Sequence, residues 1–65
     1  MAMKEFSIGT RVQIRGSEGK TFTVYTIAER DERDTFLVRL EYEERTGKKL
    51  NAGWADISLL TFSKF

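Results

Sequence analysis

The stretch KTFTVYTIAERDERDTFLVRLEYEE, residues 20–44, carries two runs rich in β-branched and aromatic residues, separated by a charged turn. Such side chains lose rotamer freedom in a helix and suit a pleated strand. The second run alternates strictly between apolar and mostly polar positions, which is the period of a half-buried strand. Its predicted inward residues are Phe36, Val38, Leu40 and Tyr42. The stretch therefore predicts two long, paired strands.

The first of these two runs is apolar on both faces. Phe22 and Val24 share one face, whereas Tyr25 and Ile27 share the other. We expect Phe22 and Val24 to face the core, and the change of face after Val24 indicates a β-bulge or a sharp bend there. Tyr25 is then the aromatic side chain that we expect to be most exposed.

Further strands are predicted on either side of this stretch. RVQIR, residues 11–15, alternates with two apolar residues on one face, and Thr46-Gly47-Lys48 gives a turn signal after residue 44. KLNAGWADISLLTF, residues 49–62, supplies a strand containing Trp54, a tight 3-10 turn capped by Asp56, and a last strand over residues 59–62. The predicted core comprises Val12, Ile14, Phe22, Val24, Phe36, Val38, Leu40, Ile57, Leu60 and Phe62.

The spacing of these elements predicts the fold class. Five short strands with turn signals about every 10 residues are typical of an all-β sandwich or barrel. A sandwich needs about 100 residues, whereas 65 residues fit a small closed barrel without exposed sheet edges. We predict one all-β domain over residues 1–65: a small five-stranded SH3-like barrel with a short 3-10 turn before the last strand. Residues 1–5 are expected to be flexible.

The string GSEGKT, residues 16–21, resembles the end of a phosphate-binding loop. That motif requires a glycine five residues before Gly19, where this chain has Ile14. It must also open a helix, whereas the residues that follow here favour a strand. We therefore interpret the string as a turn in which Gly16 and Gly19 supply positive φ angles.

The N-terminal part resembles a known family. IGTRVQIRGSEGKTFTV, residues 8–24, is similar to the opening of the YodC-type small bacterial proteins, and the whole layout looks like the SH3-like small barrels. The matching residues are Gly9, Val12, Ile14, Gly19, Thr23 and Val24. Thr10 in place of Asp, one extra loop residue and Lys20 in place of Pro depart from the pattern. The resemblance implies the fold but no defined activity, since SH3-like barrels serve many roles.

Composition limits the chemistry and the location. The chain has no Cys and no His, so we expect no disulfide, no metal and no cofactor. No apolar run approaches the roughly 20 residues that span a bilayer, and MAMKEFSIG at the start lacks the apolar region of a signal peptide. We expect a cytoplasmic protein that does not enter membranes.

Catalysis has little support in the sequence. Without His and Cys, the commonest general base and the thiol nucleophile are missing. Glu41 and Glu43 share the polar face of a strand, where carboxylates are normally solvated. Asp56, close to Trp54, is better explained as the cap of a turn. We therefore expect no enzymatic activity.

Two classes of binding function remain open. A protein-interaction module, or another accessory protein such as one from a phage or mobile element, would use exposed aromatic side chains. The candidates for this contact are Tyr25, Trp54, Tyr42 and Phe65. A nucleic-acid-binding barrel would use a basic face built from Arg11, Arg15, Lys20 and Arg39. The formal net charge of only +1 favours a protein partner, bound by a monomer or a homodimer.

Overall fold

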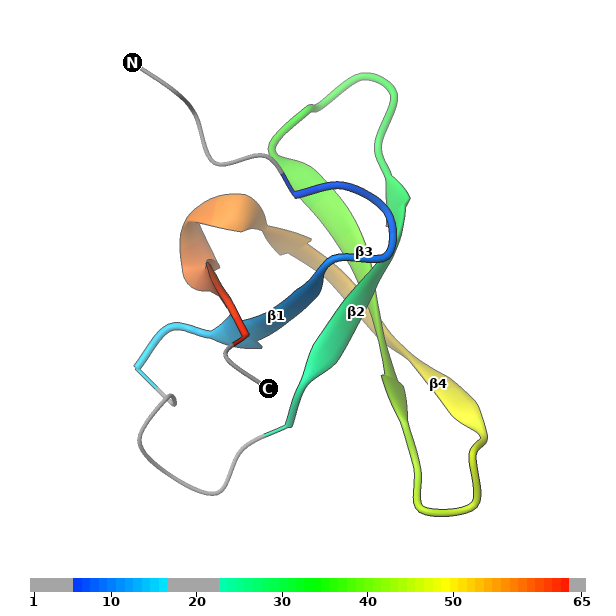
Figure 1. The fold of residues 1–65 in the computed structure, drawn as a ribbon. Coiled ribbons are helices and arrows are strands. Elements are labelled where there is room, and N and C mark those ends of the chain that lie inside the picture. Colours follow the sequence, from blue (N-terminus) through cyan, green and yellow to red (C-terminus); the bar gives the residue numbers. More distant parts are fainter. Residues whose placement is uncertain (1–5, 17–22, 64–65) are drawn as a thin grey trace.

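The computed structural model describes residues 6–16 and 23–63 of the chain (Figure 1). The elements are β1 (Arg11–Ile14), β2 (Tyr25–Arg30), β3 (Leu37–Glu43), β4 (Lys49–Asp56), the 3-10 helix η1 (Ile57–Leu59) and β5 (Leu60–Phe62). The predicted all-β class, the five strands and the short 3-10 turn before the last strand are confirmed. The predictions made for residues 1–5, Gly19, Lys20, Phe22 and Phe65 fall outside the described residues.

All five strands belong to one antiparallel sheet. Its order is β4-β3-β2-β1-β5, so that β2, β3 and β4 form a meander and β5 returns to pair with β1. Figure 1 shows how strongly this sheet is twisted and how η1 links β4 to β5. Over the described residues the two edge strands do not pair with each other. The barrel expected to be closed is therefore open along one seam.

The glycine string at residues 16–21 joins two paired strands, as predicted. Arg11 lies opposite Thr26 and Val12 lies opposite Tyr25, so that β1 and β2 are antiparallel neighbours. Gly16 has a φ of 87°, which a residue with a Cβ rarely adopts. The next element after the string is a strand, whereas a phosphate-binding loop leads into a helix.

The core is small and draws on four of the five strands and on the residues before β1. Its fully buried apolar residues are Phe6, Val12, Ile27, Val38, Leu40 and Leu60. Tyr25, Ala55 and Ile57 pack against them while remaining partly exposed. The predicted burial of Val12, Val38, Leu40 and Leu60 is thus confirmed.

Three predicted core residues are exposed instead. Ile14, Phe36 and Phe62 keep more than a third of their surface, so these predictions were wrong. Ile14 ends β1 opposite the buried Leu60, Phe62 ends the edge strand β5 opposite the buried Val12, and Phe36 precedes β3, so all three lie at the ends of their strands. The ring of Phe62 packs against that of Phe6 at a centroid distance of 4.6 Å but stays 44% exposed.

The predicted facing of the second strand was also wrong. Ile27 is fully buried opposite Leu40, and Tyr25 packs against the core on the same face. The expected bulge lies further along the strand. Because Ile27 pairs with Leu40 and Glu29 pairs with Arg39, Ala28 is the extra residue. The change of face therefore follows Ile27 and does not precede Tyr25.

A second irregularity bends the edge strand β4. Leu40 pairs with Gly53 while Glu41 pairs with Asn51, which leaves Ala52 as the extra residue. Gly53 has a φ of 87°, and its N–H donates to the Asn51 Oδ1 atom at 3.2 Å. A residue with a side chain would be strained in this conformation. The bulge makes β4 a poor template for pairing with another strand, because it interrupts the free edge.

Gln13 is a polar exception in the buried part of the molecule. Its side chain is almost fully buried, yet its Nε2 atom has no hydrogen-bond partner among the residues that the structure describes. A buried donor without a partner costs about 1–3 kcal/mol.

We expect Gln13→Met, which keeps the side-chain length, to raise the free energy of unfolding by about 1 kcal/mol in urea denaturation. Gln13→Glu should lower it instead, and an unchanged stability of the methionine variant would contradict this assignment.

Candidate functional site

A groove beside η1 is lined mainly by apolar side chains. It has a volume of about 260 Å³. The residues that line it are Phe6, Arg15, Phe36, Asp56, Ile57, Ser58 and Leu60. Phe6 and Leu60 are buried at its base, whereas Phe36 keeps 47% of its surface exposed. The groove thus offers a large aromatic side chain that the rest of the chain covers only in part.

Backbone hydrogen bonds fix the two ends of this groove. The N–H of Ile57 donates to the Phe36 carbonyl at 2.8 Å, which ties the start of η1 to the residue before β3. The N–H of Arg15 donates to the Leu59 carbonyl at 2.8 Å, which ties the other end of η1 to the residue after β1. Phe36 and Arg15 are therefore held at opposite ends of the short helix.

Asp56 provides a fixed negative charge at the Phe36 end. As predicted, it caps the 3-10 turn: its Oδ1 atom accepts a hydrogen bond from the N–H of Ser58 at 2.9 Å. This bond and the Ser58 side chain lower the pKa of Asp56 below its ordinary value. The carboxylate is therefore ionised at neutral pH, and the cap is lost only as the pH falls through that lowered pKa.

Arg15 provides the positive charge at the other end. Arg15 and Asp56 line one groove, and no ion pair between them is found within residues 6–16 and 23–63. Arg15 is exposed, and none of the hydrogen bonds made by described residues involves its guanidinium. A partner can therefore reach its donors without first breaking an internal contact.

Arg39, by contrast, is held by internal partners. Its Nε atom donates to Glu29 Oε1 at 2.9 Å, and its Nη1 atom donates to Glu41 Oε2 at 3.1 Å and to Asn51 Oδ1 at 3.2 Å. The two carboxylates raise the pKa of Arg39 above its ordinary value. A phosphate would have to compete with both of them for this side chain.

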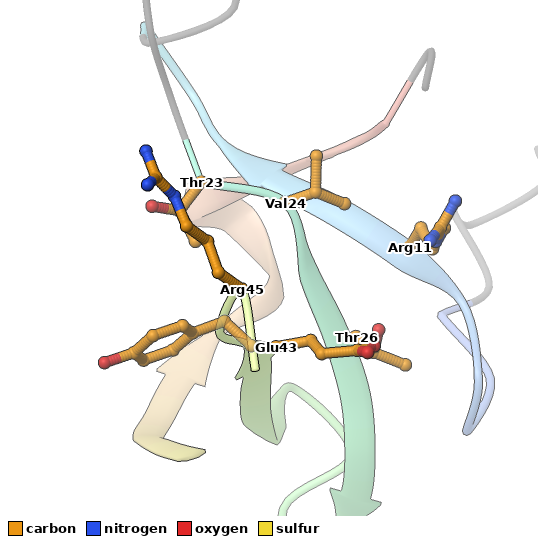
Figure 2. A pocket seen from close by; sticks show the side chains of 7 residues that line it. Arg11, Thr23, Val24, Thr26, Glu43 and Arg45 are labelled. Carbon is orange, nitrogen blue, oxygen red and sulfur yellow. The ribbon is translucent and has the colours of Figure 1, made fainter. Parts of the chain in front are cut away.

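The predicted basic residues do not gather into one face. Arg11 lines a polar hollow of about 580 Å³, Arg15 lines the apolar groove, and Arg39 is held by Glu29 and Glu41. The residues around the polar hollow are Arg11, Thr23, Val24, Thr26, Tyr42, Glu43 and Arg45. Figure 2 shows Arg11 and Arg45 on opposite sides of the hollow, and Glu43 reaching toward Thr26. The two guanidinium groups therefore share this hollow with a carboxylate.

The predicted aromatic residues separate in a similar way. Tyr25 and Tyr42 contact each other edge to face, with ring centroids 6.1 Å apart. Both are half-buried, so the expectation that Tyr25 is the most exposed aromatic was wrong. Trp54 keeps 46% of its surface exposed and lines a third hollow with Ile8 and the turn at residues 29–33. Thus Tyr42 shares a hollow with Arg11, whereas Trp54 lines a different hollow.

The sequence interpretation missed Phe36 as a site residue because it continues the apolar alternation of β3. The alternation indicates which side chains of β3 share a face, but it does not indicate which of them other parts of the chain cover.

Comparison with protein-family models, with curated proteins and with solved structures found no match to this chain. The predicted likeness to SH3-like and YodC-type proteins therefore stays a prediction.

Two further findings concern metals and membranes. Within residues 6–16 and 23–63, no group of three or more acidic, His or Cys side chains is placed to hold a metal ion. In the same residues, no helix is long and apolar enough to cross a bilayer.

Proposed function

We propose that this chain is a small, non-catalytic binding module that holds a protein partner in the apolar groove beside η1. The observation that supports it best is the half-exposed Phe36 at an apolar groove with buried Phe6 and Leu60 at its base. Exposed aromatic side chains beside a pocket commonly act as anchors in protein interfaces. In such a site the partner inserts an apolar side chain and removes Phe36 from water.

The two ion pairs of Arg39 argue for a protein over a nucleic acid. Arg39 is one of the four residues of the predicted basic face, and it forms ion pairs with Glu29 and Glu41. With a net charge of only +1, the chain has little long-range attraction for a polyanion.

The alternative, nucleic-acid binding, is supported by the polar hollow, which brings Tyr42 together with Arg11 and Arg45.

A displayed library of random linear peptides provides a partner-independent test. We expect selection against the wild-type chain to enrich peptides that contain large apolar residues. Phe36→Ala should weaken their binding by roughly tenfold or more, because truncation of an interface anchor costs about 2 kcal/mol. Affinities would be measured by fluorescence anisotropy with labelled copies of the enriched peptides.

Trp54→Ala is the matched control, because Trp54 is a similarly exposed aromatic side chain that lies outside the groove. It should leave the peptide affinity unchanged. Peptides that lose affinity with Trp54→Ala but not with Phe36→Ala would overturn the assignment of the groove. Binding of random single-stranded DNA or RNA at about 150 mM salt, lost in Arg45→Ala, would favour the polar hollow and the alternative function.

A further inference from the structure

We infer that the apolar groove selects protein segments that carry a carboxylate beside their large apolar residue, and that Arg15 binds this carboxylate. The inference rests on the proposed function, since it names the chemistry of the partner at the same groove. Two charged side chains line the groove. The guanidinium of Arg15 has no described hydrogen-bond partner, whereas the carboxylate of Asp56 accepts a hydrogen bond from the N–H of Ser58.

The surroundings of Arg15 suit a carboxylate. The guanidinium has five N–H donors in a planar fork, and a carboxylate can accept two of them at once. Arg15 lines the same groove as Phe6 and Leu60, so a bound segment would exclude water from one side of this contact. A partly desolvated ion pair of this kind is stronger than one on an open surface.

Asp56 gives the groove a direction. Its carboxylate is tied to the N–H of Ser58 and lies at the Phe36 end, because Ile57 follows Asp56 and bonds to Phe36. An acidic residue of the partner would be repelled there and attracted at the Arg15 end. A segment that placed a basic residue at Arg15 and an acidic residue at Asp56 would be repelled at both ends. The groove is therefore complementary to an acidic group on one side only.

The size of the groove limits what lies between the two charges. A cavity of about 150 Å³ can hold a benzene molecule. The groove volume of about 260 Å³ therefore suits one Phe or Leu side chain with its adjoining backbone. An acidic residue next to that side chain would lie within reach of Arg15, since neighbouring Cα atoms are about 3.8 Å apart.

Three labelled peptides of equal length test the inference. Each has Phe at its centre, with Asp, Asn or Lys on the same one side of it and Gly and Ser elsewhere. We expect the Asp peptide to bind wild type roughly five- to tenfold more tightly than the Asn peptide, and the Lys peptide to bind most weakly. Fluorescence anisotropy at about 50 and 200 mM salt should show that this preference shrinks as salt screens the pair.

Arg15→Glu should reverse the ranking, so that the Lys peptide binds best, whereas Arg15→Lys should keep the original ranking with a smaller preference. Arg45→Glu is the matched charge reversal at the polar hollow and should leave the ranking unchanged. Thermal unfolding of Arg15→Glu should match wild type, because Arg15 is exposed and its side chain makes no hydrogen bond or ion pair with another described residue.

The possible outcomes separate the inference from the proposed function. Equal binding of the three peptides, still weakened by Phe36→Ala, would overturn the role of Arg15 and leave the groove as the binding site. Absence of binding that depends on Phe36 for all three peptides would overturn both. Concentration-dependent self-association that Arg15→Glu abolishes would place a second copy of the chain in the groove, and the inferred peptide partner would then be wrong.

Discussion

Replacement of Ile27 by alanine is expected to lower the free energy of unfolding by about 2–5 kcal/mol. Ile27 is fully buried in the middle of the sheet, opposite Leu40. Its removal takes away apolar contacts and leaves a cavity that a small, twisted sheet fills only in part. Domains of this size have little stability in reserve, within a general range of about 5–15 kcal/mol. Urea denaturation followed by circular dichroism would measure the loss.

Ile8→Ala removes the same atoms from a position that is 66% exposed, which makes it a matched control. An exposed substitution of this kind usually changes the free energy of unfolding by less than about 0.5 kcal/mol. Comparable losses in the two variants would contradict the inward facing of β2. A larger loss in the Ile8 variant would be incompatible with the core described here.

The features that depend only on neighbouring residues could be predicted from the sequence. The cap of η1 is one of them, because Asp56 accepts from an N–H only two residues further along the chain. The turn at Gly47 is another, since its φ of 87° favours a residue without a side chain. The alternation in β3 was sufficient to identify Val38 and Leu40 as core residues because only one face of that strand is apolar there.

The facing of β2 could not be predicted, because both of its faces offer apolar residues. Val24 on one face and Ile27 on the other are equally good candidates for burial by composition. The pairing with β3 decides between them, since it places Ile27 opposite the buried Leu40. Such a pairing joins residues that are far apart along the chain, and local alternation contains no information about it.

The pairing of Arg39 with Glu29 depends on the same long-range register. Continued from the pair of Ile27 with Leu40, an unshifted register would place Ala28 opposite Arg39. The bulge at Ala28 instead places Glu29 there, and Glu29 binds the guanidinium. A prediction of a basic face that includes Arg39 was reasonable from the alternation alone, but a one-residue bulge changes which charges meet.

The candidate groove was the least predictable feature. It combines Phe6 from before the first strand, Phe36 from before the third, and residues of the 3-10 turn. Phe6 belongs to no periodic segment, so no pattern indicates that it is buried. The sequence indicated Arg15 as a candidate for nucleic-acid binding, and the folded chain places it at an apolar groove, with its N–H bonded to the Leu59 carbonyl.

Phe6→Ala is expected to be the most destabilising substitution, at about 3–5 kcal/mol. Phe6 is almost fully buried and packs against Phe62 with a ring-centroid distance of 4.6 Å. The variant would lose the burial of a whole ring together with this aromatic contact. Because such a loss approaches the total stability of a small domain, we expect broadened or absent thermal unfolding at 37 °C and above, measured by calorimetry.

Phe36→Ala removes the same ring from a residue that keeps 47% of its surface exposed, and it should cost about 1 kcal/mol. The two variants therefore separate folding from binding, although both residues line the apolar groove. Phe6→Ala should abolish peptide binding because the domain unfolds, whereas Phe36→Ala should weaken binding in a chain that still unfolds cooperatively near the wild-type temperature. If Phe36→Ala proves as destabilising as Phe6→Ala, Phe36 belongs to the core, and the groove has no exposed anchor to offer a partner.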